Sequence, residues 1–214
     1  MKCPICGSET RIIHHPTIGV FYGCHDCDFI FKSKLDILSE EEELLRYNQH
    51  NNSIDDPRYV SYFYRFLDHA VFRYVKGNKG IDFGSGPSPV LAQILERNHG
   101  FEMDIYDLFY SPEKVYIGKK YDLVTSTEVV EHLENPLQYF RLFKDLLKPE
   151  GVLAVMTLFH HNNDDHFLKW HYIRDLTHIS FYTPKTMRCI AAKVGLKLIY
   201  TNDIRFASFV IDHE

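Results

Sequence analysis

The sequence predicts an α/β fold in which a mostly parallel sheet carries helices on both faces. Over residues 80–211, short apolar runs alternate with stretches whose apolar residues recur every three or four positions, as in repeated βα units. Hydrophobic residues make up 45% of the 214 and charged residues 25%, enough apolar material for a real core. This length predicts one domain with a small appendage.

The chain divides into three zones, which we predict as separate units at residues 1–35, 36–75 and 76–214. The first zone holds short β-prone runs, predicted as strands at residues 11–14, 20–22 and 29–32. The second is a helical linker. Ser39 with Glu42 three positions later forms a capping box for its first helix. A second helix starts behind Asp55, Asp56 and Pro57 and runs through residues 59–75.

The third zone supplies the alternating elements. Asn135 is an N-cap followed by proline at the first helical position, so a helix begins there. Lysine, proline, glutamate and glycine at residues 148–151 end it before a strongly apolar strand. We predict strands at residues 80–83, 101–106, 121–126, 152–158, 196–200 and 206–211, and helices at residues 89–98, 136–147 and 184–194.

Two Cys-x-x-Cys pairs in the first zone predict a structural zinc site. Their four thiols are Cys3, Cys6, Cys24 and Cys27. Each such turn brings two thiolates to one side, so two turns can supply a closed tetrahedral set of four sulfur ligands. Gly7 and Asp28 follow the two pairs, where the backbone of such turns often needs a positive φ. A redox motif and accidental cysteines are the alternatives.

The sequence has five cysteines, an odd number, and four of them lie in the first 27 residues, which favours metal binding over disulfides. Cys189 is interpreted as a small core residue on a late helix. The first residues carry no apolar leader, and we expect a cytoplasmic protein.

A glycine loop follows the first strand of the third zone, with the residues Gly84, Ser85 and Gly86. Pro89 stands where a dinucleotide motif would have its third glycine, and Pro87 and Pro89 remove N–H donors that would hold a pyrophosphate. Asp82 would repel phosphate but suits a ligand with positive charge. S-adenosylmethionine (SAM) carries an ammonium and a sulfonium and has no phosphate, so the loop fits this cofactor better.

Asp107 ends the next strand, at the distance typical of an acidic residue that accepts the ribose hydroxyls of a nucleoside. Asp104 is a competitor, but it lies in the middle of the strand. The other interpretation of Asp107 is an ordinary turn residue.

These features resemble the class I SAM-dependent methyltransferases over residues 76–214, and the cysteine pairs resemble a ribbon that precedes the catalytic domain in many bacterial members. The segments that carry the resemblance are residues 82–87, 106–107, 127–133 and 147–151. It implies a Rossmann-like sheet of seven strands whose last strand, residues 206–211, is antiparallel, and it places Thr127 at the cofactor. Residues 111–120 depart from the family pattern, because they are too few for a full strand and helix and lack an acidic residue for adenine.

The run after the strand at residues 121–126 contains a second candidate site. If residues 128–133 are helical, Glu128, Glu131 and His132 share one face. Two adjacent carboxylates repel unless a cation lies between them. The pattern is similar to that of small-RNA 2′-O-methyltransferases and ubiquinone-pathway O-methyltransferases, in which a later histidine completes a metal site. His178 is the best match here.

The expected ion is Mg²⁺, Mn²⁺ or a similar cation, which would lower the pKa of a substrate hydroxyl. Without a metal, His132 or His178 could act as the general base. A purely structural role, in which Glu128 caps the helix and His132 orients its neighbours, is the remaining alternative.

The polar stretch of residues 160–178 is too long for a tight turn. One interpretation is a substrate lid with Phe167, Trp170 and Tyr172 as aromatic walls, and the other is a surface excursion whose aromatic residues fill a minor core. Asn51 and Asn52 are further candidates for the same cleft.

We therefore predict a SAM-dependent methyltransferase that methylates an oxygen of a small or carrier-bound metabolite. The net charge of −5 disfavours a protein whose main task is to bind a phosphate backbone. The longest apolar run, residues 152–159, is too short to span a membrane. The alternatives are an RNA-directed methyltransferase that docks through the ribbon, a non-catalytic adaptor with this fold, and a nicotinamide oxidoreductase.

Overall fold

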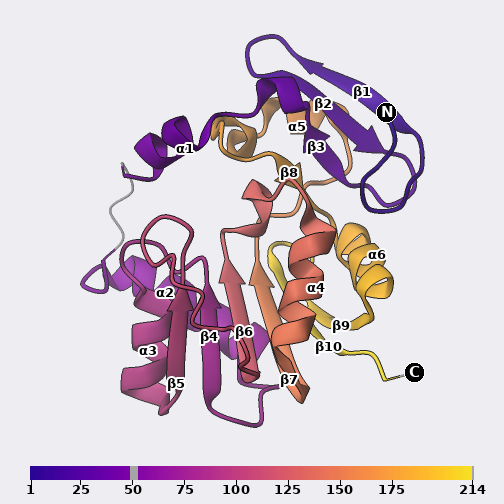
Figure 1. The fold of residues 1–214 in the computed structure, drawn as a ribbon. Coiled ribbons are helices and arrows are strands. Elements are labelled where there is room, and N and C mark those ends of the chain that lie inside the picture. Colours follow the sequence, from indigo (N-terminus) through magenta and orange to yellow (C-terminus); the bar gives the residue numbers. More distant parts are fainter. Residues whose placement is uncertain (49–52, 214) are drawn as a thin grey trace.

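A six-stranded sheet forms the centre of the molecule, and a four-stranded sheet lies beyond the carboxyl ends of its parallel strands (Figure 1). A computed structural model describes residues 1–48 and 53–213, so Asn51 and Asn52 lie outside the described residues. The central sheet has the order β5-β4-β6-β7-β10-β9. Its strands are β4 (Lys79–Phe83), β5 (Glu102–Tyr106), β6 (Tyr121–Thr127), β7 (Leu147–Met156), β9 (Leu196–Thr201) and β10 (Phe206–Ile211).

The central sheet is parallel except at β10, which pairs antiparallel with both β7 and β9. This confirms the predicted direction of the last strand. The sheet has six described strands where seven were expected. Between β5 and β6 the described chain forms turns and a single bridge from Asp107 to Ser111, because residues 108–120 are too few to add both a strand and a crossover helix.

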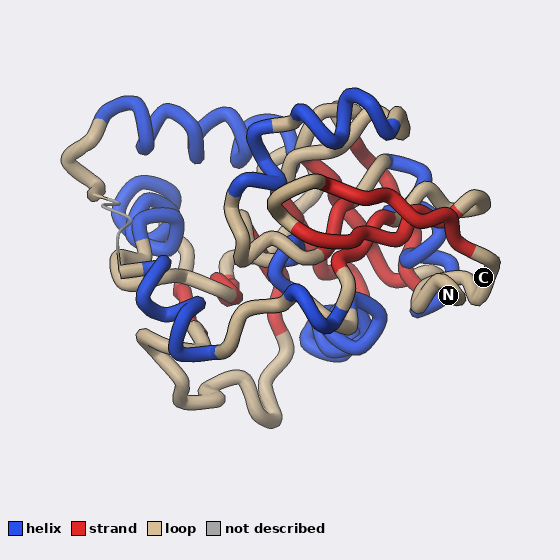
Figure 2. The backbone as a smooth tube through the Cα atoms, turned by 90° about the horizontal axis from the view of Figure 1, so that it is seen from above, coloured by secondary structure: helices blue, strands red, loops and turns tan. Residues whose placement is uncertain are grey.

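Helices cover both faces of the central sheet, as predicted (Figure 2). Alternate side chains of β7 enter two different cores: Leu153 and Val155 pack with α4 and α6, whereas Ala154 and Met156 pack with α2 and α3. The helices are α1 (Glu40–Tyr47), α2 (Pro57–Phe66), α3 (Val90–His99), α4 (Pro136–Leu146), α5 (Asp164–Lys169) and α6 (Pro184–Val194). No helix among the described residues is both long enough and apolar enough to cross a membrane.

Helix starts follow the predicted capping residues. Ser39 and Glu42 form the reciprocal capping box of α1, and the side chain of Asn135 accepts the Gln138 N–H at the start of α4. The second linker helix is shorter than predicted. It ends as α2 at Phe66 and continues as a π-helical turn, η2 (Leu67–Val71), whose apolar residues pack against the central sheet.

The small sheet is built from two distant parts of the chain. The antiparallel strands β1 (Thr10–His15), β2 (Gly19–Cys24) and β3 (Ile30–Lys32) are joined by β8 (Ser180–Phe181), which pairs with β3. The core beneath this sheet contains Phe21, Phe167, Trp170 and Phe181. The predicted substrate lid is therefore wrong for Phe167 and Trp170, and the alternative is right: these rings fill a minor core.

Candidate functional site

A cavity of about 460 Å³ lies where β4, β5 and β6 end. Its walls contain most of the residues predicted to bind the cofactor or to act on the acceptor. Those lining residues are Asp82, Gly84, Ser85, Gly86, Asp107, Thr127, Glu128, His132 and His178. Residues from α1 and α2 complete the walls with aromatic rings, so the helical linker contributes directly to this cavity.

The glycine loop has the backbone that its sequence requires. Gly84 has a φ of 86° and Gly86 a φ of 66°, in the left-handed region that side chains disfavour. A Cβ atom at Gly84 would stand 2.2 Å from Val129 Cγ2, whereas one at Gly86 would have no heavy atom within 4 Å. Gly84 is thus fixed by close packing, and Gly86 leaves open space over the loop.

Asp82 places a carboxyl group under this loop that is only 2% exposed. Its Oδ1 accepts a hydrogen bond of 2.8 Å from the Thr125 hydroxyl. Burial raises the pKa of Asp82 to about 7, and the charge of Asp107 acts in the same direction, while the bond from Thr125 opposes both. An ionised Asp82 is costly here unless a positive group approaches it, so the site suits a cationic ligand.

Asp107 ties the glycine loop to the next turn. Its Oδ2 accepts the Gly86 N–H at 2.8 Å, and its Oδ1 accepts the N–H groups of Phe109 and Tyr110 at 3.0 and 3.1 Å. The residue is therefore a turn residue that also lines the cavity. Asp104 has a different environment, because it binds Lys119 and the Tyr121 hydroxyl and does not line the cavity.

The helix at residues 128–133, the condition for a shared face of Glu128, Glu131 and His132, does not form. Glu128 has a φ of 54°, and its N–H still donates to Met156 O at 2.8 Å, so the chain turns sharply out of the sheet. Only a single 3-10 turn follows, η3 (Val130–His132). This geometry separates Glu128 from the other three members of the predicted cluster. Its carboxylate instead accepts hydrogen bonds from the hydroxyls of Tyr62 at 2.7 Å and Tyr172 at 3.0 Å.

Glu131, His132 and His178 do converge, with ligand atoms that all lie within 4.8 Å of one another. His178 Nδ1 lies 2.8 Å from Tyr172 O, and His132 Nδ1 lies 3.1 Å from Thr177 O. A carbonyl oxygen only accepts, so both Nδ1 atoms carry a proton, and in the neutral form of each ring the lone pair is on Nε2. Burial lowers the pKa of His178, which favours its neutral form.

Glu131 is fully buried and incompletely paired. Its side chain has no solvent exposure, and Oε2 has no hydrogen-bond partner among the described residues. Burial raises the pKa of Glu131 well above its ordinary value, and the nearby charge of Glu128 adds to this effect. The Tyr172 hydroxyl contacts both carboxyl groups, but its single proton can be donated to only one of them. When the Tyr172 proton is donated to Glu128, Glu131 needs its own proton or a bound cation.

Sequence reasoning missed the chain of polar groups behind Glu128. Arg205 Nη1 donates to the Tyr62 hydroxyl at 2.7 Å, and that hydroxyl donates to Glu128. Tyr62 lies in an aromatic-rich helix and Arg205 in the turn before β10, so no sequence spacing connects them. Tyr172 was singled out as a lid wall, whereas its hydroxyl bridges Glu128 and Glu131.

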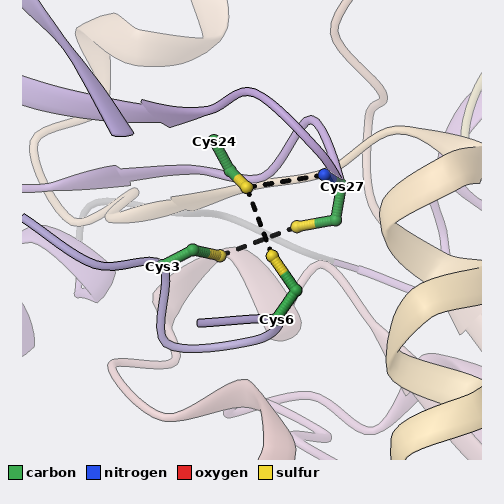
Figure 3. Close-up of side chains that lie close together, drawn as sticks. All are labelled: Cys3, Cys6, Cys24 and Cys27. Carbon is green, nitrogen blue, oxygen red and sulfur yellow. Dashed lines mark hydrogen bonds between the residues drawn. The ribbon is translucent and has the colours of Figure 1, made fainter. Parts of the chain in front are cut away.

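The four cysteines form a second cluster (Figure 3). They lie in the N-terminal zone of residues 1–35, which we call the ribbon. Sγ atoms lie 3.6 Å apart for Cys3 and Cys27 and 3.3 Å apart for Cys6 and Cys24, and all four lie within 4.8 Å of one another. Four sulfur atoms at the usual Zn–S length of about 2.3 Å would be separated by about 3.8 Å, so this donor set fits a zinc ion.

The surroundings of the cluster also match their predictions. Gly7 and Asp28 have positive φ values of 82° and 62°. All five cysteines are free thiols. Cys189, on α6, is half-buried against the same hydrophobic core and lies outside the group of four.

Comparison with known proteins gives a consistent result. A family model described as a methyltransferase domain matches residues 57–201. The chain is 39% identical over 79 residues to a ubiquinone biosynthesis O-methyltransferase of Dinoroseobacter shibae, a match that covers 37% of this chain and 31% of that protein. It is 32% identical over 96 residues to the Actinobacillus pleuropneumoniae protein of the same name, covering 43% and 41%. The matches thus span less than half the length of these curated relatives.

Solved structures share the fold. The mitomycin 7-O-methyltransferase superposes with a TM-score of 0.55 at 12% identity, covering 80% of this chain and 67% of that one. An O-methyltransferase family protein from Burkholderia thailandensis gives a TM-score of 0.56 at 14% identity, covering 80% and 64%. At these identities the likeness concerns the arrangement of strands and helices alone.

Proposed function

Because this chain belongs to the methyltransferase-domain family of class I SAM-dependent enzymes, we propose that it transfers the methyl group of SAM to a hydroxyl oxygen of a small or carrier-bound metabolite. One observation carries the proposal. A single cavity has both the glycine loop with its acidic residues and the two histidines in its walls. Methyl transfer is an in-line displacement, which requires donor and acceptor to meet in one enclosed space.

The loop half of the cavity fits SAM. The buried carboxyl group of Asp82 would face the ammonium, Asp107 would accept the ribose hydroxyls, and the open space over Gly86 would admit the nucleoside. Ser85 and Thr127 also line this half. SAM supplies an electrophilic methyl group on a positively charged sulfur. Pro87 and Pro89 leave few backbone donors for a pyrophosphate, which counts against a nicotinamide cofactor.

The histidine half of the cavity suits removal of a proton from the acceptor. The Nε2 lone pairs of His132 and His178 can accept a hydroxyl proton, and the lowered pKa of His178 keeps its ring neutral for this task. Glu131, His132 and His178 would also hold a divalent cation such as Mg²⁺ or Mn²⁺, because Oε2 of Glu131 is an acceptor to which no described residue donates. Such an ion would lower the pKa of the acceptor hydroxyl. Glu128 would act through its tyrosine partners.

The cavity walls favour an acceptor with an aromatic ring. Tyr47, Tyr59, Tyr62, Phe109 and Tyr110 all line the cavity. Stacked and edge-on contacts with such rings stabilise flat apolar ligands. The curated relatives are named for ubiquinone biosynthesis and O-methyl transfer, which supports a hydroxylated ring as the acceptor.

Calorimetry with S-adenosylhomocysteine (SAH) and with NAD tests the cofactor. We expect SAH to bind and NAD not to bind; NAD binding without SAH binding would identify an oxidoreductase, and binding of neither would identify an adaptor.

Radiolabelled SAM with a catechol, its aniline analogue and a short RNA then tests the acceptor. The proposal expects methylation of the catechol, whereas labelling of the RNA alone would transfer the assignment to RNA.

A further inference from the structure

Lys32, a residue of the ribbon, donates hydrogen bonds to both ends of the short segment of residues 176–179. The residue ends β3 and is only 3% exposed. Its ammonium Nζ donates to Leu176 O at 3.2 Å, and its backbone N–H donates to Ile179 O at 2.8 Å. Burial lowers the pKa of Lys32, and no carboxylate among the described residues pairs with its ammonium at ion-pair distance. Burial of an ammonium group without a carboxylate partner costs free energy, which indicates a specific role for this lysine.

The two residues between these carbonyls are Thr177 and His178. Thr177 O accepts the Nδ1–H of His132, and His178 is the second histidine of the cluster. On the far side of them, the Ile179 N–H donates to Glu131 O at 2.8 Å. Residues 177–179 therefore contain His178 and contact Glu131 and His132. Lys32 binds the carbonyl groups of Leu176 and Ile179, one on each side of Thr177 and His178.

A second contact links the ribbon to the same cluster. Phe29 directly follows the second cysteine knuckle, and its ring lies 5.4 Å from that of Tyr182. The Tyr182 hydroxyl donates to Val130 O at 2.6 Å, next to Glu131 in the chain. The ribbon thus contacts the segments that carry both histidines: β3 meets residues 176–179 beside His178, and Phe29 meets Tyr182, which binds Val130 near His132.

We propose that Lys32 is a positioning residue which, from the ribbon, fixes residues 177–179 and thereby the orientation and the Nδ1–H tautomer of His132 and His178. The inference rests on the proposed function in assigning these histidines to the acceptor. In this view the cysteine ribbon is a structural part of the acceptor site. A purely local role for Lys32, in which it stabilises only the small sheet, would leave the imidazoles unchanged.

The test is ¹⁵N NMR of histidine side chains in the zinc-loaded protein, which distinguishes the two tautomers directly. His132→Ala and His178→Ala assign the two sets of resonances. We expect both rings to be Nδ1–H in the wild type and to shift toward a mixture of tautomers in Lys32→Met. This change keeps an unbranched side chain of nearly the same length and removes the ammonium that donates to Leu176 O, while the backbone N–H that donates to Ile179 O remains. Lys34→Met is the matched control, because the Lys34 side chain is 81% exposed and points away into an exposed pair with Glu134.

SAH affinity, measured in the same samples, separates this inference from the proposed function. Lys32→Met should bind SAH within about twofold of the wild type and lose about tenfold to a hundredfold in kcat for the catechol. Unchanged tautomers in Lys32→Met would overturn the role of Lys32 even if SAH binds. A wild type that does not bind SAH would overturn the proposed function and leave the tautomer result intact.

Hydrogen exchange in the wild type provides a second measurement if Lys32→Met does not fold. The N–H groups of Lys32 and Ile179 are both donors in the contacts described, so a shared opening should expose them at the same rate. Fast exchange at Ile179 with full protection at Lys32 would show that the ribbon does not hold this segment, and would overturn the inference.

Discussion

The hydroxyl of Tyr172 donates to the carboxyl group of Glu131, and both residues are buried. Burial raises the pKa values of both well above their ordinary range. Such an arrangement is unfavourable for folding. Strongly shifted pKa values of this kind are typical of functional sites. Glu131 is not a lining residue of the cavity, but it lies beside His132 and His178, which are.

Glu131→Gln should abolish methyl transfer while leaving SAH affinity within about twofold of the wild type, because the residue lies on the acceptor side. The amide has nearly the same shape but cannot ionise. Steady-state turnover of the catechol and calorimetry with SAH give the two readouts. Glu134→Gln, at an exposed glutamate three residues away, is the control and should retain full turnover. Turnover retained by Glu131→Gln would make Glu131 a structural residue.

Asp107→Ala should weaken SAH binding by tenfold or more, about 1.4 kcal/mol. The change removes a ribose acceptor and also releases the Gly86 N–H that shapes the loop. Asp104→Ala, on the strand β5 that precedes Asp107, is the control, because Asp104 binds Lys119 and Tyr121 and does not line the cavity. Equal affinities for Asp107→Ala and the wild type would remove Asp107 from the cofactor site.

SAH affinity should depend on the ionisation of Asp82. With a pKa of about 7, Asp82 is protonated in the free protein at lower pH and attracts the SAH ammonium only after it ionises. The affinity should therefore rise by up to about tenfold per pH unit below pH 7 and level off above it. Asp82→Asn should bind weakly, with no such rise. Calorimetry across this pH range decides, and a wild-type affinity that is flat with pH would contradict the role of Asp82.

The same burial makes Asp82 a source of instability in the ligand-free protein. The unfolded chain releases this proton near pH 4, whereas the folded protein keeps it until about pH 7, so the contribution of Asp82 to the free energy of unfolding falls as pH rises between these values. Asp82→Asn should therefore be more stable than the wild type at pH 8, by on the order of 1 kcal/mol or more. Thermal melting should show a smaller gap at pH 5; a gap of the same size at both pH values would be the contrary result.

Metal analysis should find about one zinc ion per chain. Cys24→Ser should lose the metal and melt at a lower temperature, since zinc binding stabilises the fold that presents its ligands. Cys189→Ser should keep the metal, because Cys189 lies outside the group of four. A Cys24→Ser protein that retains zinc would exclude the ribbon as the binding site.

Much of the fold could be predicted because its signals are local. Capping at Ser39 and Asn135, the direction of the last strand and the meeting of the four cysteines all follow from residue types at short spacing. The missing seventh strand shows the limit of resemblance. The short segment after Asp107 already indicated that it could not hold a strand and a helix.

The acceptor site was predicted less completely, for two physical reasons. A helical face was assumed at Glu128, but the residue adopts a positive φ that nothing in its side chain favours, and its carboxylate turns toward Tyr62. The partners that decide the chemistry also come from distant elements. Lys32 lies on the inward face of β3, as strand alternation with Ile30 requires, but only the position of β8 shows what that face meets.

The pairing of Ile30 with Phe181 has a consequence for how the chain is made. A nascent polypeptide displays its first three strands long before β8 leaves the ribosome, and until then Phe21 and Ile30 lack the rings that later cover them. Contacts between such distant residues form late, because so long a loop must close first. The core that contains Phe21 and Ile30 is therefore completed only after residues 180–181 have been made.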